Sequence, residues 1–135
     1  MSAPLAIQSV NHISHVTRDV EASAAFYRDV LGFRQLRRPN FPFPGAWLYN
    51  YGVQIHLIGT GSGSDEHGEI STRADHVAFH VDDIEAAEQA LKEKGIPYRS
   101  NFVADTGVTQ IFFHEPDGNH IEIGTYPAPV ELTDG

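Results

Sequence analysis

Hydrophobic and polar positions along the chain predict the same succession of elements twice. In the first half, an alternating, β-branched stretch over 8–16 predicts a strand, and an apolar face repeated every three to four residues predicts a helix over 20–31. Asp19 precedes this helix as an N-cap, and Gly32 follows it as a terminator. Three further short strands are predicted over 33–38, 46–51 and 53–58.

The second half repeats this order. A strand is predicted over 75–81 and a helix over 84–94, with Asp83 as its N-cap and Gly95 at its end. Three strands follow over 98–103, 108–114 and 119–125. Each half is therefore expected to form a β-α-β-β-β module.

Three other segments interrupt this pattern. The Gly/Ser-rich segment 59–69 has the composition of a flexible linker between the halves. The proline-containing segment 39–45 predicts a loop with two exposed aromatic side chains, and the acidic tail from Pro127 is expected to pack weakly. The pattern favours an α+β fold, in which modules of about 8–58 and 72–126 form a curved, open-barrel sheet within one domain over 1–135.

Composition narrows the class of protein. The 135 residues suffice for one domain, and 41% hydrophobic with 20% charged residues is typical of a globular protein. A formal charge of -9 argues against nucleic acid or anionic membrane as a partner. The chain has no cysteine, no recognisable signal peptide and no apolar stretch of membrane length, so we expect a cytoplasmic protein.

Four side chains of metal-ligand type occupy equivalent places in the two halves. His12 and His76 begin the two modules with an offset of 64, and His56 and Glu122 end them with an offset of 66. Three imidazoles and one carboxylate suit a divalent transition metal such as Zn, Ni, Co, Mn or Fe. Without thiolates a closed structural zinc site is not expected, and an octahedral ion would keep two positions for water or substrate.

Strand alternation extends this candidate metal site to neighbouring side chains. Ser14 shares a strand face with His12, and Gln54 shares one with His56. His80 and His120 also share parity with a ligand, so they either line the site or are structural. The remaining histidines, His15, His67 and His114, are expected to be structural or exposed.

The motifs over 10–33 and 116–123 resemble the opening and closing motifs of the vicinal oxygen chelate superfamily, which includes glyoxalase I, extradiol dioxygenases, fosfomycin-resistance proteins and methylmalonyl-CoA epimerase. The resemblance covers about 8–126 and is nearest to small glyoxalase I-like proteins. It implies paired modules around a metal site and a homodimer. It also implies metal ligands at His12, His76 and Glu122.

The resemblance also implies roles for other positions. The place of His56 commonly carries a fourth ligand, a glutamate, in glyoxalase I, so with histidine there Glu122 becomes the candidate catalytic base. Trp47 and Gln54 fall where relatives line the substrate site; otherwise Trp47 is an aromatic residue of the barrel core and Gln54 is a neutral strand residue. The basic cluster of Arg34, Arg37 and Arg38 either protects an edge strand or binds an anionic substrate such as a glutathione adduct.

Three functions follow from this resemblance. The leading expectation is a divalent-metal-dependent lyase or isomerase of glyoxalase I type, which acts on a small molecule through a metal-bound enediolate and takes glutathione as a candidate co-substrate. The second is an Fe(II) extradiol-type dioxygenase. The third is a metal-free small-molecule binding module of the bleomycin-resistance kind. The sequence leaves open whether one chain or two chains of a dimer supply the site.

Overall fold

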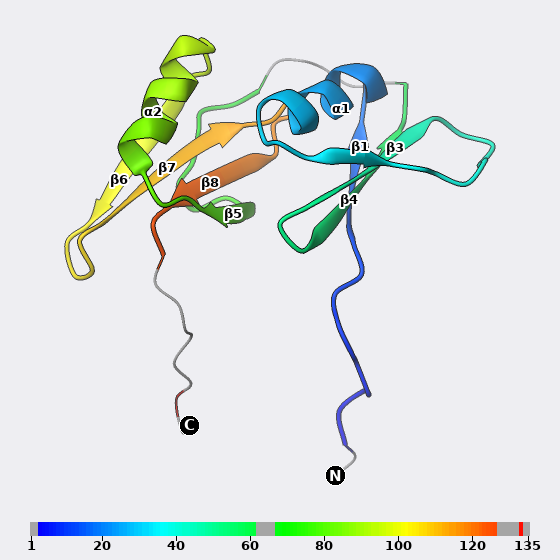
Figure 1. The fold of residues 1–135 in the computed structure, drawn as a ribbon, viewed down its shortest axis with the longest axis horizontal. Coiled ribbons are helices and arrows are strands. Elements are labelled where there is room, and N and C mark those ends of the chain that lie inside the picture. The colour runs from blue at the N-terminus through cyan, green and yellow to red at the C-terminus, as the bar shows by residue number, and fades with distance from the viewer. Residues whose placement is uncertain (1–2, 62–66, 127–132, 134–135) are drawn as a thin grey trace. The chain divides into compact units, whose positions relative to one another are not determined.

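A computed structural model of the chain describes residues 3–61, 67–126 and 133. The chain divides into two compact units, Met1–Asp65 and Glu66–Gly135. Each unit contains one four-stranded sheet and one helix (Figure 1). Among the described residues, no helix combines the length and the apolar composition that a bilayer span requires.

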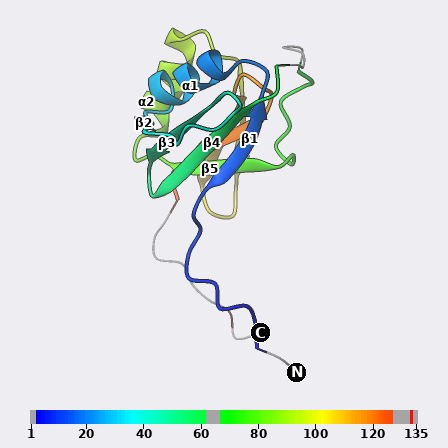
Figure 2. The same ribbon diagram turned by 90° about the vertical axis from the view of Figure 1, so that its right-hand side faces the viewer.

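Unit 1 is a β-α-β-β-β module. Its elements are β1 (Ile13–Thr17), α1 (Val20–Asp29), β2 (Arg34–Leu36), β3 (Gly45–Asn50) and β4 (Val53–Gly59). The strand order is β1-β4-β3-β2, with β1 parallel to β4 and the other pairs antiparallel. β1, β4 and β3 lie side by side in Figure 2, so the last strand of the module is at the centre of the sheet.

Local sequence signals set the position of α1 in unit 1. The Asp19 carboxylate accepts a hydrogen bond from the Ala22 amide at 3.0 Å, and Gly32 takes a φ of +79° after the helix. α1 packs against β3 and β4 and buries Ala24 and Tyr27. Burial of this apolar face stabilises the helix, which is too short to be stable alone.

Unit 2 repeats the module. Its elements are β5 (His76–His80), α2 (Ile84–Glu93), β6 (Tyr98–Val103), β7 (Val108–His114) and β8 (His120–Gly124). The strand order is β5-β8-β7-β6, again with one parallel pair, β5 with β8. The Asp83 carboxylate caps α2 by accepting from the Ala86 amide at 3.0 Å. The core is built mainly on β7 and β8 and includes Ile111, Phe113 and Ile121.

Most predicted elements are confirmed, and one boundary is wrong. The strand expected over 8–16 begins only at Ile13, so His12 lies just before β1. The preceding segment exposes Leu5, Ile7 and Val10 to 83%, 76% and 78%, because β-branched alternation does not supply the partner strand that a ladder needs. The helices end within two residues of the predicted positions.

The α+β class and the paired β-α-β-β-β modules are confirmed, although neither four-stranded sheet closes into a barrel. Residues 62–66 of the predicted linker and 127–132 of the predicted weakly packed tail lie outside the described part of the chain.

Candidate metal centre

Unit 1 brings together the two histidines that the sequence repeat selected. His56 lies in the central strand β4, in register with Ser14 on β1 and Trp47 on β3. Its ring stacks on His12, with centroids 3.9 Å apart and planes 10° from parallel, and on Trp47, with centroids 4.0 Å apart and planes 5° from parallel. The His56 ring is therefore stacked on both His12 and Trp47, and His56 is only 8% exposed.

Each histidine of this pair has one nitrogen bound to an amide oxygen. His12 Nδ1 lies 2.8 Å from Asn11 Oδ1, and His56 Nε2 lies 3.0 Å from Gln54 Oε1. Since an amide oxygen only accepts, these nitrogens carry the protons and the lone pairs are on His12 Nε2 and His56 Nδ1. The lone pair of an imidazole nitrogen lies in the plane of its ring, and the planes of these stacked rings are nearly parallel, so one ring must tilt before both nitrogens bind a single ion.

The surroundings of His56 favour its neutral form. Burial first, and then the charges of His12 and Arg38, lower the pKa of His56 below its usual value. A neutral imidazole is the form that binds metal ions.

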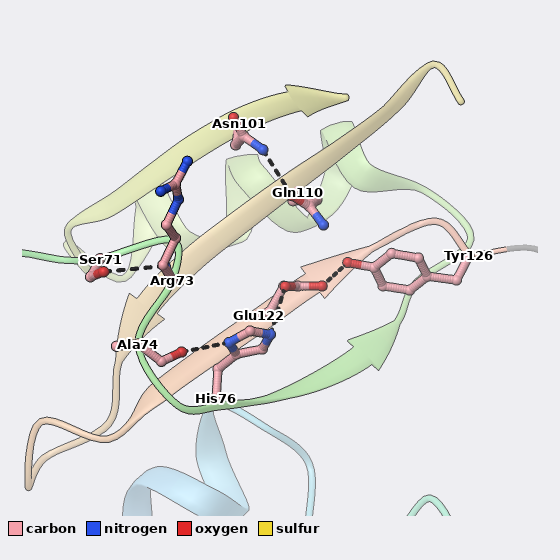
Figure 3. Close-up of polar contacts among 8 residues, drawn as sticks. All are labelled: Ser71, Arg73, Ala74, His76, Asn101, Gln110, Glu122 and Tyr126. Atoms are coloured by element: carbon pink, nitrogen blue, oxygen red, sulfur yellow. Dashed lines mark hydrogen bonds and ion pairs between the residues drawn. The ribbon is translucent and has the colours of Figure 1, made fainter. Parts of the chain in front are cut away.

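Unit 2 brings together the other pair (Figure 3). His76 begins β5 and Glu122 lies in the middle of β8, with His76 Nε2 3.1 Å from Glu122 Oε1. The opposite ring nitrogen, His76 Nδ1, donates to the Ala74 carbonyl oxygen at 2.7 Å. Glu122 is 5% exposed, so its charge is largely shielded from water.

This second pair fits a divalent ion in its chemistry and its spacing. The Ala74 carbonyl fixes the proton on Nδ1 and leaves Nε2 as the coordinating atom, the usual arrangement of a metal-binding histidine. His76 Nε2 and Glu122 Oε1 lie 3.1 Å apart, so both atoms could bind one divalent ion at ordinary ligand distances.

Tyr126 is a site residue that the sequence did not indicate. Its hydroxyl donates a hydrogen bond to Glu122 Oε2 (Figure 3). Burial, followed by this hydrogen bond and the charge of Glu122, raises the pKa of Tyr126 far above its usual value, while a hydrogen bond with Gln110 opposes the shift. The only indication in the sequence was Gly124. This small residue lies midway between Glu122 and Tyr126 and follows a run of larger side chains.

The predicted substrate-binding residues of unit 1 lie in different surroundings. Register places Ser14 and Trp47 on the face of the sheet that carries His56, and the hydrogen bond of Gln54 to His56 places it there too. The Arg38 guanidinium lies over the rings of Phe41 and Phe43, at 5.0 and 4.9 Å from their centroids. The other two arginines, Arg34 and Arg37, are exposed.

Arg38 belongs to a continuous aromatic cluster that reaches the candidate ligands. Phe41 stacks on Phe43 with centroids 5.4 Å apart and lies 6.0 Å from Trp47, which in turn stacks on His56. One Arg38 nitrogen, Nη2, donates to the Phe43 carbonyl oxygen at 2.9 Å. Within the described part of the chain, no carboxylate forms an ion pair with Arg38.

Four of the remaining histidines have structural partners in unit 2. His114 Nε2 lies 3.2 Å from His120 Nε2, which also accepts from the Ser71 amide, and His67 packs edge-on against His114. His80 lies between Asp82 and the Tyr126 amide. Over the described residues, no hydrogen bond or ion pair joins His80 or His120 to His76 or Glu122.

The structure thus forms two pairs, His12 with His56 and His76 with Glu122, one in each unit. Over 3–61, 67–126 and 133, no three or more histidine, aspartate or glutamate side chains gather in a way that could hold a metal ion.

The chain matches a known protein family over nearly the whole of its described part. The family model for the Glyoxalase/Bleomycin resistance protein/Dioxygenase superfamily matches residues 9–123. The chain belongs to this superfamily.

Relatives within the glyoxalase superfamily span the same region. The chain is similar to "Glyoxylase I 4" of Arabidopsis thaliana, with 39% identity over 125 residues that cover 89% of this chain and 72% of that protein. It is also similar to a lactoylglutathione lyase of Haemophilus influenzae, with 30% identity over 123 residues that cover 77% of this chain and 82% of the relative.

Solved structures of the superfamily share the fold. A glyoxalase/dioxygenase from Nostoc punctiforme superposes with a TM-score of 0.73 at 26% identity, covering 95% of this chain and 97% of that one. A lactoylglutathione lyase from Agrobacterium tumefaciens superposes with a TM-score of 0.66 at 21% identity, covering 88% and 94%, which supports the fold alone. The predicted family and fold are therefore confirmed.

Proposed function

We propose that this chain is a divalent-metal-dependent enzyme of the glyoxalase I type. The observation that carries the proposal is the His76–Glu122 pair, in which Nε2 and Oε1 lie 3.1 Å apart and the Ala74 carbonyl holds the proton on the far nitrogen. The likeness to lactoylglutathione lyases at 30% identity and above supports the same activity.

The proposed ligand set joins this pair with His12 and His56. The basis is the equivalence of the four positions in the two modules and the pairing of His12 with His56 within unit 1. Zn, Ni, Co, Mn or Fe suits three imidazoles and a carboxylate. When bound, such an ion supplies Lewis acidity toward the oxygen atoms of the substrate.

Glu122 is the proposed catalytic base, because it is the one carboxylate of the set. On the hemithioacetal of a 2-oxoaldehyde and glutathione, it would remove the proton from the carbon that bears sulfur and hydroxyl and return it to the adjacent carbonyl carbon. A second proton moves between the two oxygens. The product is a 2-hydroxyacyl thioester, so the reaction consumes no oxidant or reductant.

The substrate is proposed to contact the sheet face around His56. Trp47, Gln54 and Ser14 share that face, and Arg38 adds a cation that no described carboxylate neutralises. In a chain of net charge -9, this cation favours a carboxylate of the glutathione part as its ligand. Arg37 is exposed and is proposed as a secondary contact.

The assembly is also a proposal. We take 1–135 as a single glyoxalase-like domain whose modules, about 8–58 and 72–126, are joined by the segment 59–69. The superfamily resemblance favours a homodimer in which one chain or two chains supply the four ligands, and the cytoplasm stays the proposed location. Light scattering with metal analysis gives the number of ions for each chain.

The decisive experiment measures thioester formation by the metal-stripped protein after each of the five metals is added. The substrate is the hemithioacetal of methylglyoxal and glutathione. Glu122→Gln should lower turnover about 10²- to 10⁴-fold, whereas Glu88→Gln, a matched change on α2, should not. Absence of turnover with every metal would refute the proposal.

A ring-cleaving dioxygenase is the second candidate, and one observation favours it. The ring of His56 is stacked on both His12 and Trp47, and if His56 stays in this stack, His12, His76 and Glu122 remain as a two-histidine, one-carboxylate set. Oxygen uptake with catechols and Fe(II) tests this activity. A purified protein that binds no metal but binds a drug-like ligand would instead indicate the metal-free binding module.

A further inference from the structure

Tyr126 follows strand β8, and its ring lies back across that strand. A Cβ atom built at Gly124 would lie 2.7 Å from both Cζ and Oη of Tyr126, closer than side chains tolerate. The ring therefore occupies the volume that any larger residue at position 124 would need. Gly124 allows the tyrosine to reach inward from a position two residues beyond the end of the strand.

The Tyr126 hydroxyl ends at one oxygen of the Glu122 carboxylate, and His76 faces the other. The hydroxyl donates to Oε2, while His76 Nε2 lies 3.1 Å from Oε1 (Figure 3). The carboxylate is thereby held at both oxygens. Rotation of Glu122 would break one of the two contacts.

A short polar network supports the tyrosine from the neighbouring strands. Gln110 on β7 is in register with Gly124, and its side chain forms a hydrogen bond with Tyr126. Asn101 on β6 donates to Gln110 Oε1 at 2.9 Å, which leaves the Gln110 NH₂ group to face the phenol (Figure 3). Side chains from four parts of unit 2, namely β5, β6, β7 and the segment after β8, therefore fix the orientation of the Glu122 carboxylate.

We propose that Tyr126 is a positioning residue that directs Oε1 of Glu122 toward the metal ion and limits ligation to that one oxygen. The inference rests on the proposed metal-dependent function. Binding through both oxygens would require Oε2 to turn away from the phenol. With Tyr126 in place, Oε2 keeps one lone pair for the proposed proton transfer while the other accepts the hydroxyl.

Phenylalanine at position 126 separates this role from packing, because it keeps the ring and removes only the hydroxyl. The experiment titrates metal-free Tyr126→Phe with Co²⁺ in a metal-buffered solution and follows the visible absorption of the bound ion. Loss of an outer hydrogen bond to a ligand typically weakens metal binding about 10- to 100-fold, and we expect a loss in this range. The cobalt spectrum should also change, since the carboxylate is free to bind through both oxygens.

Tyr98→Phe is the matched control. The Tyr98 hydroxyl donates to Glu88 Oε2 at 2.7 Å, also in unit 2, but this pair joins β6 to α2. Both substitutions remove one tyrosine–glutamate hydrogen bond, and thermal unfolding of the metal-free proteins measures the shared structural effect. Only Tyr126→Phe should weaken Co²⁺ binding; an equal loss in both variants would overturn the inference.

Gly124→Ala gives an independent test, because the new methyl group displaces the tyrosine ring without changing any polar atom. It should weaken Co²⁺ binding as Tyr126→Phe does, and the double variant should lose no more than either single one. If the parent protein binds no Co²⁺, the proposed function fails. If the parent binds it and Tyr126→Phe binds it equally well, the function stands and the positioning role is wrong.

Discussion

The indole ring of Trp47 lies face to face with the imidazole ring of His56, with centroids 4.0 Å apart and planes 5° from parallel. Trp47 is the only tryptophan of the chain. Its fluorescence therefore reports on metal binding at the candidate ligand His56, since no other indole contributes to the emission.

Nickel binding at His56 should quench the fluorescence of Trp47, because the paramagnetic ion would lie within a few ångströms of the indole and the stack must tilt. Titration of the metal-free protein with Ni²⁺ should give a saturable decrease in emission. His56→Ala should abolish this saturable change, whereas His15→Gln, on the opposite face of β1, should retain it. A full quenching curve from His56→Ala would contradict the ligand role.

Arg38→Gln should raise KM for the glutathione hemithioacetal more than it lowers kcat. A hydrogen bond to a charged group contributes about 1.5–3 kcal/mol, which corresponds to a roughly 10- to 100-fold rise in KM. Arg34→Gln is the matched control, since Arg34 is exposed on β2 and lies outside the aromatic cluster. Equal KM values for the two variants would show that Arg38 does not bind the substrate.

The stability of the metal-free protein should fall as the solution becomes acidic, in part through His114. Burial first, and then the charges of His120 and His67, lower the pKa of His114 in the folded state. The unfolded chain binds the proton more tightly, so this contribution to stability is complete above about pH 6.5 and is lost as the pH falls from there toward the folded-state pKa. Urea unfolding of His114→Gln should depend less on pH between about 7.5 and 5 than that of the parent; an unchanged dependence would contradict this account.

The two helix caps should contribute equally to stability, because Asp19 and Asp83 each accept a 3.0 Å hydrogen bond from the amide three residues on. Asp19→Ala and Asp83→Ala should each lower the free energy of unfolding by about 1 kcal/mol. Asp29→Ala, at the last position of α1, should leave it unchanged or slightly raised, because a carboxylate there opposes the helix dipole. Chemical denaturation of the three variants tests this, and a large loss at Asp29 would count against it.

Much of the architecture could be predicted because its causes are local in the sequence. The caps Asp19 and Asp83 and the terminators Gly32 and Gly95 act within a few residues, so both helices were found close to their true bounds. The repeated ligand positions could also be found, because a duplicated module keeps equivalent residues at nearly constant spacing. By contrast, the strand predicted from 8 was wrong before Ile13, since strand formation needs a partner that alternation alone does not provide.

The sequence by itself determined the α+β modules, the helix boundaries and the four side chains of metal-ligand type, because periodicity, capping and repetition are properties of neighbouring or aligned residues. Only the tertiary structure decided that His56 stacks between His12 and Trp47, that Arg38 rather than Arg34 joins the aromatic cluster, and that Tyr126 reaches Glu122 across Gly124. Those relationships depend on strand register and on the direction of side chains between non-adjacent strands, which the order of residues does not contain.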